Sequence, residues 1–141
     1  MLSDQALLTA VLDRELIGFL TAVNRSGQPQ TSPVWYLRVG DDLVVYNRPG
    51  SPRLSSIAAN PRVAFTLRGD LRARGGVSLE GQATMAEDLP TAEELPGYVD
   101  KYGREIDRLG WTPASFSADY SLGLRIVVTR VRAFGLEKLS D

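Results

Sequence analysis

Short runs of alternating apolar and polar residues, separated by turn sequences, limit what this chain can fold into. The clearest run is residues 77–85, where Val77, Leu79, Ala83 and Met85 alternate with polar side chains or glycine. Alternation with a period of two is typical of a strand with one buried face. A similar pattern covers residues 17–24, 30–39, 43–47, 63–67 and 122–134. The sequence therefore predicts six strands.

The connections between these strands are short. Asn24-Arg25-Ser26-Gly27 and Gly40-Asp41-Asp42 are typical of tight turns, so the first three strands are expected to form an antiparallel meander. Parallel pairing would need a crossover helix between most strands. The last strand changes phase near Thr129, as a β-bulge would make it. We predict a mainly β fold, a six-stranded antiparallel barrel with small helices, in one domain over residues 1–141.

Segments before and between the predicted strands have sequence features typical of helices. Ser3 or Asp4 can cap a first helix that ends at Gly18. Pro52 begins a second helix that ends before Asn60-Pro61. Thr91 and Glu94 have the spacing of a capping box, and Pro96 is expected to start a third helix that ends at Gly110. Thr112-Pro113 opens a last short helix.

The chain contains no cysteine and no histidine. Their absence excludes disulfides, thiolate nucleophiles, serine–histidine dyads, the common zinc sites and histidine-ligated haem. We expect no metal site, and an enzyme built from this chain would take its reactive group from a cofactor. No apolar run approaches the roughly 18 residues of a membrane-spanning helix, and Met1-Leu2-Ser3-Asp4 lacks the basic start of a secretory signal. A cytoplasmic protein is expected.

Charge is distributed unevenly along the chain. Residues 25–74 hold eight arginines and three aspartates, whereas residues 80–107 hold eight acidic and two basic side chains. Fourteen of the sixteen basic residues are arginine, whose planar guanidinium suits phosphate and carboxylate groups. An anionic ligand is expected to prefer the first segment, although codon bias alone could produce the arginine excess.

The segment from Asn47 to Arg53 has the features of an anion site. Ser51 can cap the helix that Pro52 begins, and Gly50 lets the backbone approach a ligand closely. Arg48 and Arg53 lie on either side of the free N–H groups at this helix start. Local sequence equally allows a well-capped helix with two solvated arginines.

The segment from Thr31 to Tyr36 is a second candidate. Pro33 cannot donate to a strand ladder, so it is expected on an edge strand or at a bulge. Free backbone groups beside it could bind the rim of a planar heterocycle that rests against Val34, Trp35 or Tyr36. The alternative is that Trp35 only fills the core. For Trp111, Phe116 and Tyr120, which could cap a pocket or seal a dimer, core packing is the simpler interpretation.

Five segments in order resemble a known family: Pro33-Val34-Trp35-Tyr36, Val45-Tyr46-Asn47, Arg53-Leu54 with Ile57, Asn60-Pro61-Arg62-Val63 and Leu79-Glu80-Gly81-Gln82-Ala83. Together they resemble the pyridoxamine 5'-phosphate oxidase-like, FMN-binding split β-barrels. Within that family the chain is most similar to the branch that uses the deazaflavin coenzyme F420. The similarity runs from about Leu2 to Leu136.

The resemblance implies a homodimer with cofactor sites at the subunit interface. It implies that Ser32, Pro33, Val34 and Trp35 contact the ring system of the cofactor. Tyr46, Arg48, Ser51 and Arg53 would hold its ribityl-phosphate end, beside Gly50. Because the chain lacks the C-terminal arginine and histidine region of authentic pyridoxamine phosphate oxidases, that substrate is not expected. FMN remains an alternative to F420, since the fold takes either.

The leading hypothesis is an F420- or FMN-dependent oxidoreductase that exchanges hydride with a small conjugated molecule. Tyr36, Tyr46 or water would protonate the product. One alternative is a non-catalytic carrier of a flavin, haem or bilin. Another is a barrel that binds single-stranded nucleic acid on Trp35, Tyr36 and Tyr46, but an isoelectric point near 5.5 argues against it. We expect no nucleic-acid and no membrane partner.

Overall fold

The computed structural model describes residues 1–139, and its centre is a curled antiparallel sheet of seven strands. In chain order the strands are β1 (Gly18–Val23), β2 (Pro29–Val34), β3 (Leu37–Val39), β4 (Asp42–Asn47), β5 (Arg62–Thr66), β6 (Gly76–Met85) and β7 (Leu122–Phe134). Their order across the sheet is β2-β1-β5-β6-β7-β4-β3, and every pair is antiparallel. The predicted mainly β, antiparallel split barrel is confirmed.

The two edges of the sheet belong to strands that are neighbours in sequence. β2 and β3 lie at opposite ends of the strand order, yet Trp35 and Tyr36 alone connect them. The three Cα–Cα steps from Val34 to Leu37 span at most about 11 Å, so the sheet must curl to bring the end of β2 close to the start of β3. We call this two-residue junction the seam. Pro33 lies on the edge strand β2, as a residue without a backbone donor should.

The prediction of one strand over residues 30–39 was wrong, and so was the three-stranded meander that it implied. The segment leaves the sheet at the seam, because the backbone N–H of Tyr36 donates to the Tyr102 hydroxyl at 2.8 Å rather than to a strand. β2 therefore pairs with β1 and β3 with β4, which gives seven strands in place of six.

β7 has the bounds and the irregularity that the sequence predicts. It pairs with β6 along its length, and the register shifts between Glu80 and Gly81, which face Arg130 and Val128. Thr129 is the extra residue, and its hydroxyl donates to the Glu80 carbonyl at 3.2 Å. The phase change in the alternation is therefore a β-bulge, which bends this long strand.

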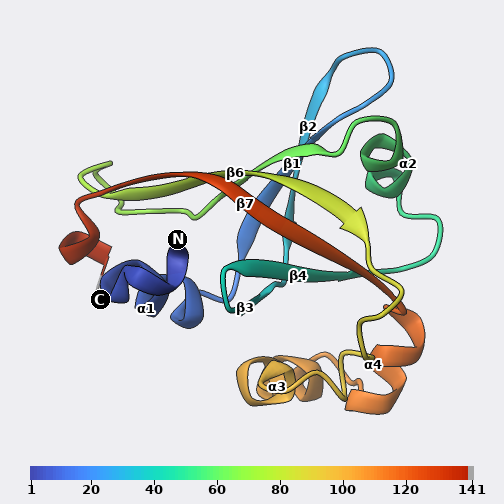
Figure 1. Cartoon of the computed structure of the whole chain (residues 1–141). Coiled ribbons are helices and arrows are strands. Elements are labelled where there is room, and N and C mark those ends of the chain that lie inside the picture. The colour runs from blue at the N-terminus through green and yellow to red at the C-terminus, as the bar shows by residue number, and fades with distance from the viewer. Residues whose placement is uncertain (140–141) are drawn as a thin grey trace.

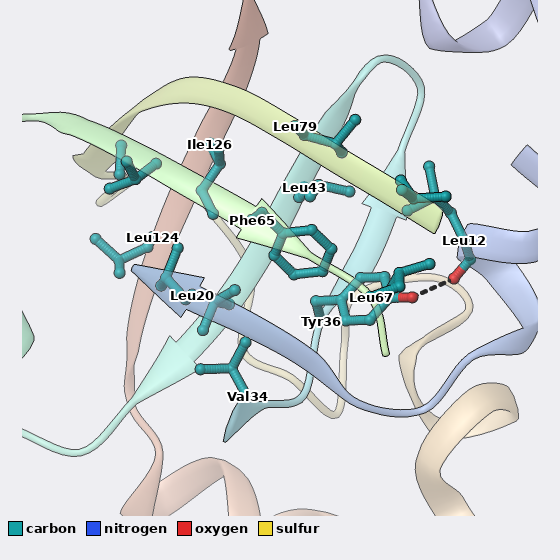
Figure 2. Close-up of a cluster of buried hydrophobic side chains, with 14 of the residues drawn as sticks. Leu12, Leu20, Val34, Tyr36, Leu43, Phe65, Leu67, Leu79, Leu124 and Ile126 are labelled. Carbon is teal, nitrogen blue, oxygen red and sulfur yellow. Dashed lines mark hydrogen bonds between the residues drawn. The ribbon is translucent and has the colours of Figure 1, made fainter. Parts of the chain in front are cut away.

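The sheet has a core on each face. The inner core lies inside the curl, where Leu20, Phe65, Leu79 and Ile126 converge (Figure 2). The outer core lies between β4 and the helices, and includes Tyr98, Tyr102, Ile106 and Phe116. β4 contributes side chains to both cores. Leu43 and Val45 face the inner core, and Val44 and Tyr46 face the outer core.

Four α-helices surround the sheet: α1 (Ala6–Arg14), α2 (Pro52–Ala59), α3 (Tyr98–Arg108) and α4 (Pro113–Asp119). Short 3-10 helices, η1 (Leu2–Asp4) and η2 (Leu136–Leu139), lie near the chain ends. Figure 1 shows α1 at one side of the sheet, where it contacts η1 and η2, whereas α3 and α4 lie below β4. Within the described part of the chain, no helix combines the length and apolarity needed to cross a bilayer.

Two predicted helix starts need correction. Ser3 and Asp4 belong to η1, where the Ser3 N–H donates to the Asp41 carboxylate at 2.8 Å, and α1 begins after Gln5. α3 begins after Gly97 rather than at Pro96, and the Thr91 hydroxyl donates to the Glu94 carboxylate within a turn. The short helix predicted at Thr112-Pro113 is present as α4, and Thr112 and Ser115 form a capping box at its start.

Candidate functional site

Two cavities lie beside the edge strand β2, and they share the lining residue Arg53. The first, the aromatic cavity, has a volume of about 360 Å³, within the range of small-molecule sites. One wall comes from the β1–β4 region and the other from α3, α4 and the segment between them. Its lining residues are Ile17, Pro33, Val34, Trp35, Tyr46, Arg53, Tyr98, Leu109, Trp111, Phe116 and Tyr120.

The second, the serine cavity, has a volume of about 250 Å³ and lies between β1, β2 and the start of α2. Hydroxyl and amide groups make up most of its polar lining. The lining residues are Leu20, Ala22, Gln30, Thr31, Ser32, Ser51, Pro52, Arg53 and Ser56. Arg53 lines both cavities, so a ligand that filled both would pass this guanidinium.

Arg53 carries an unpaired donor. Its Nη1 atom is buried and has no hydrogen-bond partner among the described residues. Burial also holds the pKa of the guanidinium below its ordinary value, because the charged form loses solvation. A buried donor without a hydrogen-bond partner is costly, and an anion bound beside Arg53 would supply an acceptor.

The turn before α2 is open to a ligand. Ser51 occupies the cap position that the sequence predicts, but its hydroxyl makes no capping hydrogen bond. Gly50 has φ of +82°, and no atom lies within 4 Å of the place that a Cβ would occupy. The hydroxyl and the start of the helix therefore add hydrogen-bonding groups beside Arg53.

Stacking between aromatic rings holds the side chains that line the aromatic cavity in place. Trp35 stacks on Tyr102 with centroids 4.6 Å apart and on Phe116 at 5.4 Å. Phe116 in turn stacks on Tyr120 at 4.6 Å. The two interpretations of Trp35 are thus compatible, since the indole packs against the outer core and also lines the cavity.

Arg48 lies apart from the other predicted anion-binding residues. Its Nε donates to the Asp119 carboxylate at 2.8 Å, and it is not among the residues that line either cavity. The structure therefore brings Ser32, Ser51 and Arg53 together around one cavity, and Pro33, Val34, Trp35 and Tyr46 around the other.

The two tyrosines considered as proton donors have their hydroxyls engaged elsewhere. Tyr46 donates to the Pro90 carbonyl at 2.6 Å, and Tyr36 donates to the Leu12 carbonyl at 2.7 Å inside the inner core (Figure 2). Burial raises the pKa of Tyr46 to about 12 and raises the pKa of Tyr36 still further. Neither hydroxyl is available to a ligand in the aromatic cavity.

The second wall of the aromatic cavity was largely missed by sequence reasoning. For Trp111, Phe116 and Tyr120 the sequence favours core packing, and Tyr98 and Leu109 lie in the helix that it predicts between Pro96 and Gly110. The structure gives them both roles, because all five line the cavity. Their only sequence signal is the clustering of aromatic residues beyond residue 97, which does not say which strand they face. Among residues 1–139, no cluster of three or more acidic side chains is placed to hold a metal ion.

A curled antiparallel sheet, with an aromatic cavity and an arginine-lined cavity beside its edge strand, has the architecture of a split β-barrel. The sequence matches the family described as pyridoxamine 5'-phosphate oxidase over residues 5–135, and the chain belongs to that family. No curated protein sequence is significantly similar to the chain.

Solved structures share the fold. The conserved hypothetical protein Rv2991 from Mycobacterium tuberculosis is 23% identical, with a TM-score of 0.77 over 97% of this chain and 88% of that one. An F420 reductase is 22% identical, with a TM-score of 0.63 over 87% and 94% of the two chains. The haem storage protein HutZ from Vibrio cholerae is 16% identical, with a TM-score of 0.63 over 97% and 99%. At these identities the similarity concerns the fold alone.

Proposed function

We propose that this protein is a coenzyme F420-dependent oxidoreductase that exchanges hydride with a small conjugated molecule in the cytoplasm. The ring system would lie in the aromatic cavity against Pro33, Val34 and Trp35. The anionic tail would pass Arg53 into the serine cavity. The observation that carries the proposal is Arg53, which lines both cavities and has a buried Nη1 without a hydrogen-bond partner among the described residues.

The residues fit such a cofactor in both parts. The aromatic cavity offers flat apolar surface, and among residues 1–139 its only charged lining residue is Arg53. The serine cavity offers the hydroxyls of Ser32 and Ser51, which can donate to a phosphate beside the guanidinium. F420 and FMN share a planar ring and a ribityl-phosphate tail, so these groups would hold either.

The protein would position the cofactor and the molecule that reacts with it, and would exclude water from both. When bound, the reduced cofactor supplies a hydride. The stacked Trp35 and Phe116 form fixed walls that exclude water and orient a flat partner. Because Tyr36 and Tyr46 already donate to backbone carbonyls, we infer that water protonates the product.

We also propose that the protein is a homodimer whose partner subunit covers the mouth of the aromatic cavity. Ile17 and Leu109 line that cavity and are 40% and 65% exposed. Apolar side chains at the rim of a site are expected to be covered by another surface. Light scattering is expected to give twice the mass of the chain, and a monomer at micromolar concentration would contradict this part of the proposal.

Titration of the purified protein with F420 and with FMN tests the proposal. We expect saturable binding of F420 at micromolar concentration, and binding of FMN alone would favour the FMN-dependent alternative. Arg53→Ala should weaken binding by about 1.5–3 kcal/mol if the side chain contacts phosphate. Arg62→Ala is the matched control, because this exposed arginine lines neither cavity.

A turnover assay distinguishes an enzyme from a non-catalytic carrier. The protein loaded with reduced cofactor is expected to pass hydride to a conjugated acceptor such as a quinone. Retention of the cofactor through purification without oxidation by any such acceptor would instead indicate a carrier. If neither F420 nor FMN binds, the proposed function is wrong.

A further inference from the structure

Arg48, in the loop between β4 and α2, contacts the end of α4. Arg48 reaches residues far away in sequence, and its Nε donates to the Asp119 carboxylate at 2.8 Å. Its guanidinium carbon lies 4.9 Å from the centre of the Tyr120 ring and 5.9 Å from that of Trp111. Both distances are within the range of cation–π contacts.

The residues that Arg48 contacts belong to the wall of the aromatic cavity. Trp111 and Tyr120 line the cavity, and Asp119 is the last residue of α4. Arg53, by contrast, lies five positions along the chain, lines both cavities and keeps an unpartnered Nη1. The two arginines around the turn at Gly50 therefore face different surroundings.

We propose that Arg48 is a positioning residue for the aromatic wall and that it is not a ligand for the anionic tail. It holds the end of α4 and the two rings that precede and follow this helix. Through them it sets the shape of the cavity that receives a flat ring. This inference rests on the proposed function only in assigning the ring to the aromatic cavity.

The shape of the guanidinium matters for this role. A planar guanidinium can lie flat over a ring while its edge donates to a carboxylate, so one side chain makes both kinds of contact. Arg48 and Asp119 are 54% and 45% exposed, so their ion pair alone would contribute little. The two cation–π contacts act on the same wall as the ion pair, so we expect the three contacts together to have a measurable effect.

Binding of ring and tail can be measured separately. Lumichrome carries the tricyclic flavin ring without a ribityl-phosphate tail, so its affinity reports the aromatic cavity alone. Quenching of the fluorescence of Trp35 and Trp111 gives its dissociation constant, and titration with FMN and F420 gives the affinity for ring and tail together. The variants are Arg48→Ala, Asp119→Asn, Arg53→Ala and the exposed control Arg25→Ala.

Arg48→Ala is expected to weaken lumichrome binding about fivefold, which corresponds to the combined effect of a half-exposed ion pair and cation–π contacts. Asp119→Asn should weaken it in the same direction by a smaller factor. The ratio of cofactor affinity to lumichrome affinity should stay unchanged in both variants and should fall in Arg53→Ala. Arg25→Ala should alter neither quantity.

Three results would overturn the inference. Arg48→Ala could leave lumichrome binding unchanged, it could lower the affinity ratio as Arg53→Ala does, or lumichrome could fail to bind the unmodified protein. Failure of the proposed function has a different signature. If neither F420 nor FMN binds but lumichrome binds and depends on Arg48, the positioning role stands while the proposed cofactor is wrong.

Discussion

At the scale of single residues, Lys101 is notable because its ammonium group is partly buried, and burial disfavours the charged form. Its Nζ lies 3.8 Å from the centre of the Tyr36 ring and donates to the Leu12 carbonyl at 3.3 Å. Burial lowers the pKa of Lys101 to about 8, and the opposing attraction of Asp13 and Glu15 does not restore the ordinary value. The folded protein therefore gives up this proton at a lower pH than the unfolded chain does.

The stability of the protein should consequently rise with pH in a defined interval. Between about pH 8 and the pKa near 10.5 of an exposed lysine, the unfolded chain binds more protons at this site than the folded one. The free energy of unfolding should increase by on the order of 1–2 kcal/mol between pH 8 and 9.5. Above pH 10 the trend should reverse, because burial raises the pKa of Tyr36, Tyr98 and Tyr102 and favours their protonated forms.

Urea denaturation at pH 7, 8, 9 and 9.5 measures this dependence. Lys101→Met should remove the rise between pH 8 and 9.5. The exposed Lys138→Met is the control and should leave the rise intact. A wild-type curve that is flat over this interval would show that Lys101 keeps its ordinary pKa.

At the scale of elements, two helices begin with a hydroxyl residue followed by proline, and only one uses the hydroxyl as a cap. Thr112 accepts from the Ser115 N–H at 3.0 Å and forms a capping box, whereas Ser51 makes no side-chain capping bond. Thr112→Ala should therefore cost about 1 kcal/mol of stability. Ser51→Ala should change stability by less than about 0.5 kcal/mol.

The same pair of variants tests the anion site. Ser51→Ala is expected to weaken cofactor binding without destabilising the fold, because its hydroxyl is free to contact a ligand. Thermal unfolding and cofactor titration on both variants give the two quantities. An equal loss of stability in Ser51→Ala and Thr112→Ala would mean that Ser51 caps its helix in solution.

Local signals explain which elements the sequence could predict. The bulge at Thr129 and the start of α2 at Pro52 each follow from a few adjacent residues, and the structure has both. The break between β2 and β3 could not be predicted in this way, since it depends on a hydrogen bond from Tyr36 to Tyr102 of a distant helix. Residues 30–39 read as one strand because alternation records burial and not strand partners.

The residues of the candidate site also fall into two groups, those that local sequence predicts and those that it does not. Gly50, Ser51 and Arg53 could be predicted as a group because they are adjacent in the chain. The aromatic wall could not, because residues 98–120 reach the cavity only when α3 and α4 pack on the outer face of β4. The partner of Arg48 was missed for the same reason, as Asp119 lies 71 positions away.

At the scale of the whole molecule, the seam joins the two edges of the sheet and also the two cores. The Tyr36 side chain is buried in the inner core, while Trp35 packs against the outer core. The Tyr102 hydroxyl accepts from the Tyr36 N–H at 2.8 Å, and it lies 2.7 Å from the Leu16 carbonyl, to which it can donate. One hydroxyl on α3 thus connects the seam to the chain between α1 and β1.

Removal of that hydroxyl should affect stability and the site together. Tyr102→Phe leaves the buried Tyr36 N–H without a partner, which costs about 1–3 kcal/mol. Because Trp35 stacks on Tyr102 and lines the aromatic cavity, the ring affinity measured with lumichrome should fall as well. Tyr46→Phe is the matched control: it removes one tyrosine hydroxyl from the same outer core, and its acceptor at the exposed Pro90 can bind water, so it should cost less than about 1 kcal/mol. Equal losses of stability in the two variants would show that the seam holds without Tyr102, and that packing alone keeps the edges of the sheet together.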